Sequence, residues 1–212
     1  MKITRLGHAC LLVESTSARV LVDPGVFSRA EAFELGDLDA VVVTHQHPDH
    51  LHPERAGEVA ERHAGAVLLA DPETAEQQGG SWRAHRDGDV TTVGDLTITG
   101  VGSRHAPILP ELPRIANVGV LIADATTTLF HPGDSYESVP DGVDVLALPL
   151  TAPWARIDET VRFATQVGAG DLFPIHDAAI AEAAYGIYWG HVERFGGAER
   201  AHRLSPGEFL ER

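Results

Sequence analysis

The chain has 212 residues, of which 43% are hydrophobic, so it is long and apolar enough to bury a full core. Its 16 lysines and arginines against 31 aspartates and glutamates give a formal net charge of -15. This charge argues against nucleic acid or an anionic membrane as a partner. The single cysteine, Cys10, excludes an internal disulfide and fits a reducing compartment. Without a recognisable signal peptide or membrane span, the sequence predicts one cytoplasmic domain over residues 1–212.

The first part of the chain contains short apolar runs separated by turn residues, and strands then alternate with helices. The pattern predicts three strands, a buried strand, a helix, another strand and a second helix. In chain order these are Lys2–Leu6, Cys10–Glu14, Arg19–Val22, Ala40–Val43, Glu54–His63, Val67–Ala70 and Asp71–Gln78. Residues 79–89 are polar and are predicted to form a turn-rich connection.

The second part begins with two hairpins and continues with alternating strands and helices. The hairpin strands are Val90–Val93 with Leu96–Val101, and Asn117–Ala123 with Thr127–Phe130. A buried strand, two helices and a closing strand follow at Val143–Leu148, Ile157–Val167, Ala178–Phe195 and Ala201–Leu210. Three prolines between Ala106 and Arg114 predict an ordered loop over the mouth of a site. The whole order predicts an α/β fold.

The segment Thr44–His50 places three imidazoles and a carboxylate directly after the predicted strand Ala40–Val43. Pro48 cannot continue that strand, so these side chains lie on a loop at the end of the strand. His45 and His47 are two residues apart and form one pair of ligands, and Asp49 and His50 form a second. Imidazole and carboxylate groups suit a borderline divalent cation, and the lack of thiolates argues against a closed structural zinc site. The alternative is a surface loop that binds metal adventitiously.

The spacing HxHxDH after an apolar strand resembles the metallo-β-lactamase superfamily of metal-dependent hydrolases. Strand, proline turn and following helix fall where that superfamily has them, which argues against the surface-loop alternative. The resemblance covers nearly the whole chain. It implies an αββα sandwich of two mixed β-sheets flanked by helices.

The resemblance also implies a set of metal ligands, because later segments supply the expected residue types in the expected order. By this carry-over, His45, His47 and His105 bind one metal, while Asp49, His50 and His176 bind a second. Asp134, which follows Gly133, would bridge the two. The expected cofactors are two divalent ions, with Zn²⁺ favoured and Mn²⁺ as the alternative.

Two segments upstream of the metal motif have less specific signals. Gly7-His8-Ala9 resembles the opening of the branch that includes L-ascorbate-6-phosphate lactonase, which implies a catalytic or pocket-lining role for His8. A structural role at a strand junction remains the alternative. The carboxylate of Asp23 is expected either to hydrogen-bond a ligand histidine or to cap the turn Asp23-Pro24-Gly25. The roles of His52 and His131 stay open, with a supporting or surface position favoured for His131.

Two divalent ions that share a water make hydroxide available at neutral pH, so the predicted reaction is hydrolysis of a small-molecule ester, lactone, amide or phosphodiester. Asp49 is expected to orient the attacking water or accept its proton. Arg104 and Arg114 are candidates for binding an anionic group of the substrate, although solvated arginines are the alternative. Trp154 is expected to line the pocket wall or the core.

Two other functions remain open at this point. One is a mononuclear or dinuclear iron oxidoreductase on the same fold, which the identity of the metal would separate from a hydrolase. The other is a non-catalytic metal-binding module, against which the complete ligand set argues. A homo-oligomer is an option, because the aromatic residues of the last helix suit an interface as well as a core.

Overall fold

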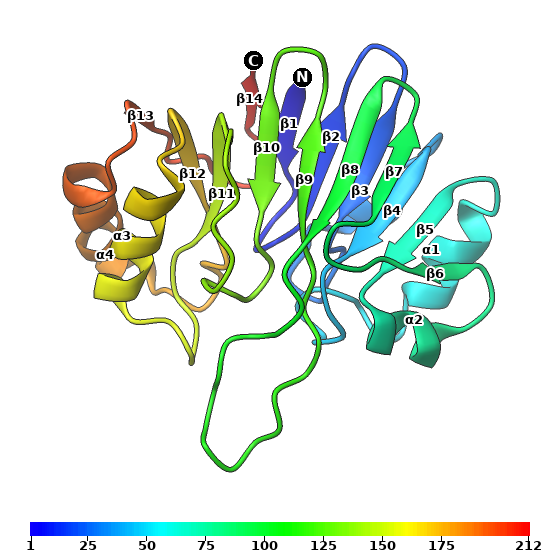
Figure 1. Cartoon of the computed structure of the whole chain (residues 1–212), viewed down its shortest axis with the longest axis horizontal. Helices are drawn as coiled ribbons and strands as arrows, with labels where there is room; N and C mark the ends of the chain where they lie inside the picture. Colours follow the sequence, from blue (N-terminus) through cyan, green and yellow to red (C-terminus); the bar gives the residue numbers. More distant parts are fainter.

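The computed structural model describes residues 1–212, and its strands form two sheets that pack face to face (Figure 1). The first sheet has seven strands in the order β14-β1-β2-β3-β4-β5-β6. Their bounds are β14 Phe209–Glu211, β1 Lys2–Arg5, β2 Leu11–Glu14, β3 Arg19–Val22, β4 Ala40–Val43, β5 Val67–Ala70 and β6 Trp82–Ala84. The second sheet also has seven, in the order β13-β12-β11-β10-β9-β8-β7. These are β13 Arg200–Ala201, β12 Asp171–Ile175, β11 Val145–Pro149, β10 Thr128–His131, β9 Gly119–Ala123, β8 Leu96–Val101 and β7 Val90–Val93.

Both sheets change from antiparallel to parallel pairing part of the way across. In the first sheet β14 to β3 are antiparallel, and β3 to β6 are parallel. In the second sheet β7 to β10 are antiparallel, and β10 to β13 are parallel. Because parallel strands end at the same edge, the segments that follow β4, β10 and β12 gather at one end of the sandwich. The β2–β3 turn and the β9–β10 turn lie at the opposite end.

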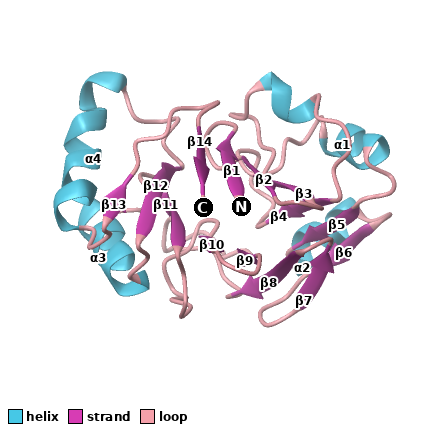
Figure 2. Ribbon diagram, turned by 90° about the horizontal axis from the view of Figure 1, so that it is seen from above, coloured by secondary structure: helices cyan, strands magenta, loops and turns pink.

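Helices cover the outer faces of both sheets, as Figure 2 shows from above. On the first sheet these are α1 Ala56–Arg62 and α2 Pro72–Gln78, together with the 3₁₀ helix Ala30–Phe33; on the second they are α3 Ile157–Val167 and α4 Glu182–Phe195. One buried apolar cluster lies between the sheets, and one lies under each helical layer. The predicted αββα sandwich is therefore confirmed. None of the helices has the length and apolar character that crossing a membrane requires.

Three sequence predictions of secondary structure are wrong in detail. The connection at residues 79–89 contains the edge strand β6, in which only Trp82 is buried, so its apolar signal is a single residue. The helices α1 and α4 begin at Ala56 and Glu182, later than predicted, because turns precede both of them. The closing strand is two strands in different sheets, since the turn before Gly207, with φ of +98°, lets the chain cross from β13 to β14.

Candidate metal centre

The loop after β4 is held in place by the turn that follows β3. The backbone N–H of Val26 donates to the carbonyl of Pro48 at 2.8 Å. Gly25 packs so closely on the same loop that a Cβ there would lie 1.9 Å from the carbonyl oxygen of Asp49. Glycine is therefore required at this contact. The turn Asp23-Pro24-Gly25 thus fixes the backbone that presents Asp49 and His50.

The second sheet delivers three further site residues from the segments after β8, β10 and β12. These are His105, Asp134 and His176, and all three are buried. Asp134 is placed by Gly133, which has φ of +61°. A Cβ added at this position would lie 2.3 Å from the Oδ1 of Asn117. That same Oδ1 accepts the backbone N–H of Asp134 at 2.9 Å. The close approach of the two strand ends therefore depends on glycine at position 133.

The two sheets bring the sequence-predicted residues into two adjoining groups. One consists of His45, His47, His105 and Asp134; the other consists of His8, Asp49, His50 and His176. Within each group, one ligand atom from each residue lies within 4.8 Å of every other. Each group can therefore converge on a single ion.

Asp134 contacts histidines of both groups, the position expected of a bridging ligand. Its Oδ1 lies 3.0 Å from the Nε2 of His50, and its Oδ2 lies 3.2 Å from the Nε2 of His176. The same Oδ2 lies 3.4 Å from the Nε2 of His105. Oδ1 makes no hydrogen bond, although it is fully buried.

The imidazoles are held so that their Nε2 atoms face the centre. The Nδ1 of His105 donates to the carbonyl of Ala106 at 2.6 Å, and the Nδ1 of His176 donates to that of Thr151 at 2.7 Å. The Nδ1 of His50 lies 2.7 Å from the Oδ2 of Asp23. Because Nδ1 carries the proton, Nε2 has a free lone pair, and in all three residues this atom is buried without a hydrogen-bond partner. An unpaired buried acceptor is costly, and a divalent cation satisfies all of them at once.

Electrostatics at the centre favour a cation. Burial lowers the pKa of His176, but the facing carboxylates of Asp134 and Asp49 outweigh burial and raise that pKa to about 9. Burial raises the pKa of Asp49, but the facing imidazoles of His176, His8 and His50 outweigh burial and hold the pKa well below its usual range. The carboxylates therefore stay ionised and create a negative potential among the imidazoles. Residues and charge together fit divalent metal ions.

Asp23 supports the ligands from behind and is fully buried. Its two oxygens accept the backbone N–H and the hydroxyl of Thr44, each at 2.7 Å, besides the contact with His50. Of the alternatives in the sequence, the structure thus shows the hydrogen bond to a histidine. His8, Asp23 and His176 have φ of +50°, +48° and +55°, a region that residues other than glycine rarely adopt. Such backbone strain gathers at functional sites.

His8 is the member of the second group whose ring nitrogens are both engaged, and its tautomer follows from its two contacts. The backbone N–H of Ala178 points to its Nδ1 at 3.3 Å, so Nδ1 accepts. Nε2 then carries the proton and donates to the Oδ2 of Asp49 at 3.2 Å. Burial lowers the pKa of His8. A neutral His8 therefore holds Asp49 in position.

The residues predicted to bind substrate have different surroundings. The indole N–H of Trp154 donates to the Oδ2 of Asp134 at 2.8 Å, so this side chain belongs to the centre itself. Arg114 donates to the carbonyl of His105 at 2.7 Å and pairs with Glu137 at 2.6 Å. Arg104 donates to the carbonyl of Arg114 at 3.3 Å on the exposed side of the loop. Neither guanidinium makes a hydrogen bond or an ion pair with the side chain of a predicted metal ligand.

The remaining histidines of open role lie outside the two groups. His131 is buried behind Asp23, with its Nε2 2.9 Å from the carbonyl of Ala9, and its Nδ1 accepts the N–H of Gly133. The ring of His52 packs on Phe33.

Sequence reasoning missed Thr44 and Asn117 as supports of the centre. Thr44 stood within the motif, whereas nothing in the sequence marked Asn117.

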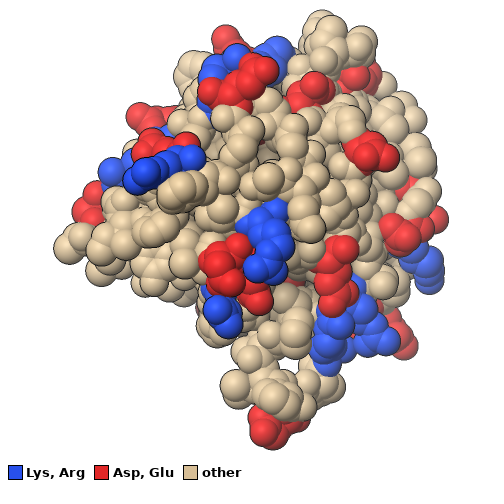
Figure 3. All heavy atoms as spheres, turned by 60° about the vertical axis from the view of Figure 1, so that its left-hand side comes forward, with Lys and Arg blue, Asp and Glu red and all other residues tan.

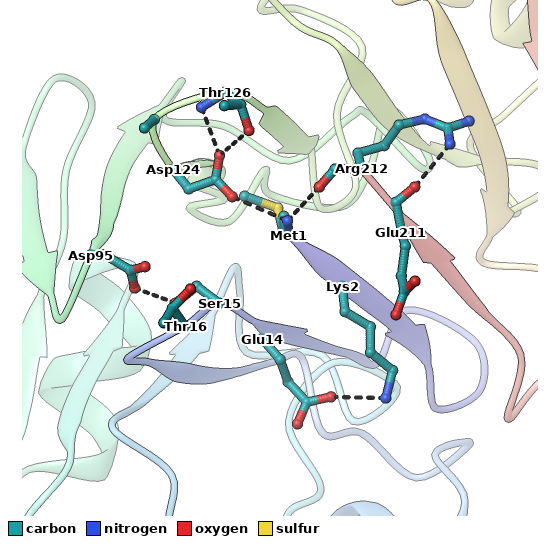
Figure 4. A pocket seen from close by; sticks show the side chains of 11 residues that line it. Met1, Lys2, Glu14, Ser15, Thr16, Asp95, Asp124, Thr126, Glu211 and Arg212 are labelled. Carbon is teal, nitrogen blue, oxygen red and sulfur yellow. Dashed lines mark hydrogen bonds and ion pairs between the residues drawn. The ribbon is translucent and has the colours of Figure 1, made fainter.

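The largest hollow of the surface lies at the other end of the sandwich and has a volume of about 880 Å³ (Figure 4). No histidine lines it. Its charged groups satisfy one another or nearby hydroxyls: Lys2 pairs with Glu14 at 3.4 Å, and Asp95 accepts from Ser17 at 2.9 Å. The volume of a hollow therefore does not identify the functional end of the sandwich. The buried ligand atoms without partners indicate the other end.

Comparison with known proteins agrees with this geometry. A family model described as beta-lactamase superfamily domain matches residues 2–176. Protein Rv0786c of Mycobacterium tuberculosis is 43% identical over 195 residues, which cover 91% of each chain. The UPF0173 metal-dependent hydrolase TK0141 of Thermococcus kodakarensis is 30% identical over 71% of this chain and 72% of its own. The crystal structure of a putative metal-dependent hydrolase from Parabacteroides distasonis superposes with a TM-score of 0.77 at 18% identity, covering 96% of this chain and 93% of that one.

The fold, the two groups of ligands and these relatives agree. The chain belongs to the metallo-β-lactamase superfamily and, within it, to the UPF0173 metal-dependent hydrolases.

Proposed function

We propose that this metal-dependent hydrolase binds two divalent cations, zinc in first place and manganese as the alternative, and cleaves a small-molecule ester, lactone or phosphodiester. The observation that carries the proposal is Asp134, a buried carboxylate within 3.4 Å of histidines from both ligand groups. One ion would be held by His45, His47 and His105. The other would be held by Asp49, His50 and His176, and Asp134 would bind both ions.

When bound, such a pair of ions lowers the pKa of a shared water to about 7 and so supplies hydroxide at neutral pH. The chain provides the group that orients this water. Asp49 is the most exposed carboxylate of the centre, with 24% of its side chain accessible, so an entering water can reach it. Because it is ionised at neutral pH, it can accept a hydrogen bond from that water and orient it for attack.

His8 acts through Asp49. Both of its ring nitrogens are engaged, one by the backbone of Ala178 and the other by Asp49, so it orients the carboxylate and does not itself contact the reacting atoms. The indole N–H of Trp154 does the same for Asp134. A lactone is the substrate that the resemblance of Gly7-His8-Ala9 to the lactonase-like branch favours.

The direct test is turnover by protein stripped with a chelator and reloaded with zinc or manganese. The substrates are a γ-lactone, p-nitrophenyl acetate and bis(p-nitrophenyl) phosphate. We expect hydrolysis of at least one, and we expect Asp49→Asn to lower kcat by about 10²- to 10⁴-fold, because an amide lacks the negative charge that orients the water. This variant is assayed at saturating metal, and its metal content is measured alongside, because Asp49 is also a proposed ligand and an amide oxygen binds a divalent ion more weakly than a carboxylate.

No hydrolysis of any substrate by either loaded form would contradict the proposal. Full activity of Asp49→Asn would refute the role of Asp49 alone. Activity that requires iron and consumes oxygen would favour an oxidoreductase instead.

A further inference from the structure

The connection between β8 and β9, residues 102–118, projects from the ligand-bearing end of the sandwich and is drawn in green at the foot of Figure 1. Its base is a short ladder, in which Arg104 and Ala116 form an antiparallel bridge and the N–H of His105 donates to the carbonyl of Ile115 at 3.0 Å. The base therefore orients His105, and the rest of the connection extends past the metal centre.

A pocket of about 220 Å³ lies between this connection and the ligands. His47 and His105 form its inner wall, so the pocket opens directly beside the first ligand group. Its outer wall is apolar and consists of Ile108, Leu112, Pro113 and Ile115. Because drug-sized ligands need about 300 Å³ or more, a pocket of this size holds one part of a substrate.

Arg114 is the one charged residue of the lining, and its guanidinium is already engaged. It pairs with Glu137 at 2.6 Å and donates to the carbonyl of His105 at 2.7 Å. The carboxylate of Glu137 cancels its charge locally, so an anionic group would have to displace that partner.

The outer part of the connection is apolar as well. Leu109 and Leu112 are 54% and 49% exposed. In Figure 3 this projecting part, at the foot of the molecule, is largely free of charged side chains, and acidic atoms lie at its lower end. Together with the formal net charge of -15, these acidic atoms disfavour an anionic ligand and leave an uncharged one unaffected.

We propose that this pocket binds an uncharged hydrocarbon arm of the substrate, a short alkyl chain or a single aryl ring, while the bond to be cleaved lies at the metal centre. This inference rests on the proposed function, because it assigns the substrate class of the same site. Apolar walls bind such an arm by removing its surface from water.

The first test measures kcat/KM for p-nitrophenyl acetate, butyrate and hexanoate. We expect an increase of about fourfold for each added methylene that enters the pocket. Mono-p-nitrophenyl succinate, which ends in a carboxylate, should be hydrolysed less well than the butyrate.

The loop supplies a matched pair of variants. Leu112 lines the pocket and Leu109 does not, although both are leucines of similar exposure on the same loop. We expect Leu112→Ser to lower kcat/KM for the hexanoate by about fivefold or more and to leave the acetate nearly unchanged. Leu109→Ser should leave the whole series unchanged. Equal effects of the two variants would overturn the proposal.

A second variant tests the charge argument by a gain of function. Glu137→Gln leaves Arg114 without its carboxylate partner, so the succinate ester should gain in kcat/KM relative to the butyrate. If the wild-type protein already prefers the succinate ester, the pocket binds anions and the proposal is wrong.

Binding without turnover separates this inference from the proposed function. Saturation-transfer NMR on the metal-loaded protein compares hexanamide with adipic acid monoamide, which has the same carbon chain with a carboxylate at its far end. We expect stronger transfer to hexanamide, and loss of it in Leu112→Ser but not in Leu109→Ser. If this binding result is obtained but no ester is hydrolysed, the proposal of an apolar pocket stands and the proposed hydrolysis is refuted. Hydrolysis with no preference in either assay would refute the pocket alone.

Discussion

Asp134 and Asp171 are both buried carboxylates, each 3% exposed, and they lie at opposite ends of the sandwich. Asp171 stands at the start of β12 and accepts hydrogen bonds at both oxygens from Arg200 and Arg212, with His202 as a further partner. Asp134 follows β10, receives a single N–H from Trp154 besides contacts with histidines, and has one oxygen without any partner.

The difference shows how a structural carboxylate is distinguished from a functional one. Arginines always carry a charge, so Asp171 is neutralised by the chain itself. Asp134 is surrounded by imidazoles whose free lone pairs also need a positive partner. A bound cation satisfies acceptors of both kinds at once, whereas Asp171 needs no partner beyond the chain.

The largest effect is expected from Asp134→Ala. Removal of the carboxylate that contacts both ligand groups should reduce metal content by at least one ion per chain and lower hydrolysis to background, while the circular dichroism spectrum is retained. The matched control is Asp124→Ala, an aspartate in the β9–β10 turn at the opposite end. Metal content like that of the wild type in Asp134→Ala would exclude the bridging role.

Asp23→Asn should have the next largest effect. An amide offers one acceptor where Asp23 uses both oxygens, for Thr44 and for His50, so the imidazole of His50 loses its orientation. We expect metal affinity to fall by about 10- to 100-fold, measured by competition with a chromophoric chelator. Unchanged affinity would mean that the backbone alone positions His50.

Trp154→Phe removes one hydrogen bond to Asp134 and keeps an aromatic ring in place. We expect metal affinity to fall by about fivefold, or about 1 kcal/mol, which is less than the usual value of about 1.5 to 3 kcal/mol for a hydrogen bond to a charged group because water partly replaces the indole N–H. The chain has three tryptophans, so intrinsic fluorescence gives a second measurement. The change in fluorescence on metal binding should disappear in Trp154→Phe and persist in Trp82→Phe. The reverse would contradict the contact.

Asp171→Asn should affect stability and leave the metal site unchanged. Burial raises the pKa of Asp171, but Arg212, Arg200 and His202 outweigh it and hold the pKa well below its usual value of 3.8. The substitution should lower the free energy of unfolding at pH 7 by about 1 to 3 kcal/mol, reduced by the partial exposure of the arginines.

The pH dependence of this difference follows from the direction of the shift. Below pH 3.8 the unfolded chain takes up a proton at Asp171 before the folded chain does, so the stabilisation is complete above that pH and declines as the pH falls. Denaturant titrations of both proteins at pH 7 and pH 3 measure it. A difference that stays constant would show that the ion pairs contribute nothing, and altered metal content would show that the two ends are coupled.

Much of this architecture could be predicted from the sequence, because the dense apolar runs and the histidine motif are local signals. Val41, Val42 and Val43 mark a buried strand, and the proline after His47 marks the loop. The family resemblance supplied the later ligands, which the chain order alone does not bring together.

The missed features depend on contacts between distant segments. Asn117 supports Asp134 only because the ends of β9 and β10 approach each other, and Trp154 reaches Asp134 from a loop twenty residues away. The strand β6 is too short to have a periodic pattern, and the split of the closing strand depends on which sheet each half meets. Such pairings are tertiary, and no local propensity encodes them.

The most direct test of the central claim is the metal content per chain of protein purified without a histidine tag, measured by elemental analysis. Two adjoining groups that share Asp134 predict about two zinc or manganese ions per chain, falling to one or none in Asp134→Ala. About one iron per chain, or no metal after reconstitution, would contradict the dinuclear centre.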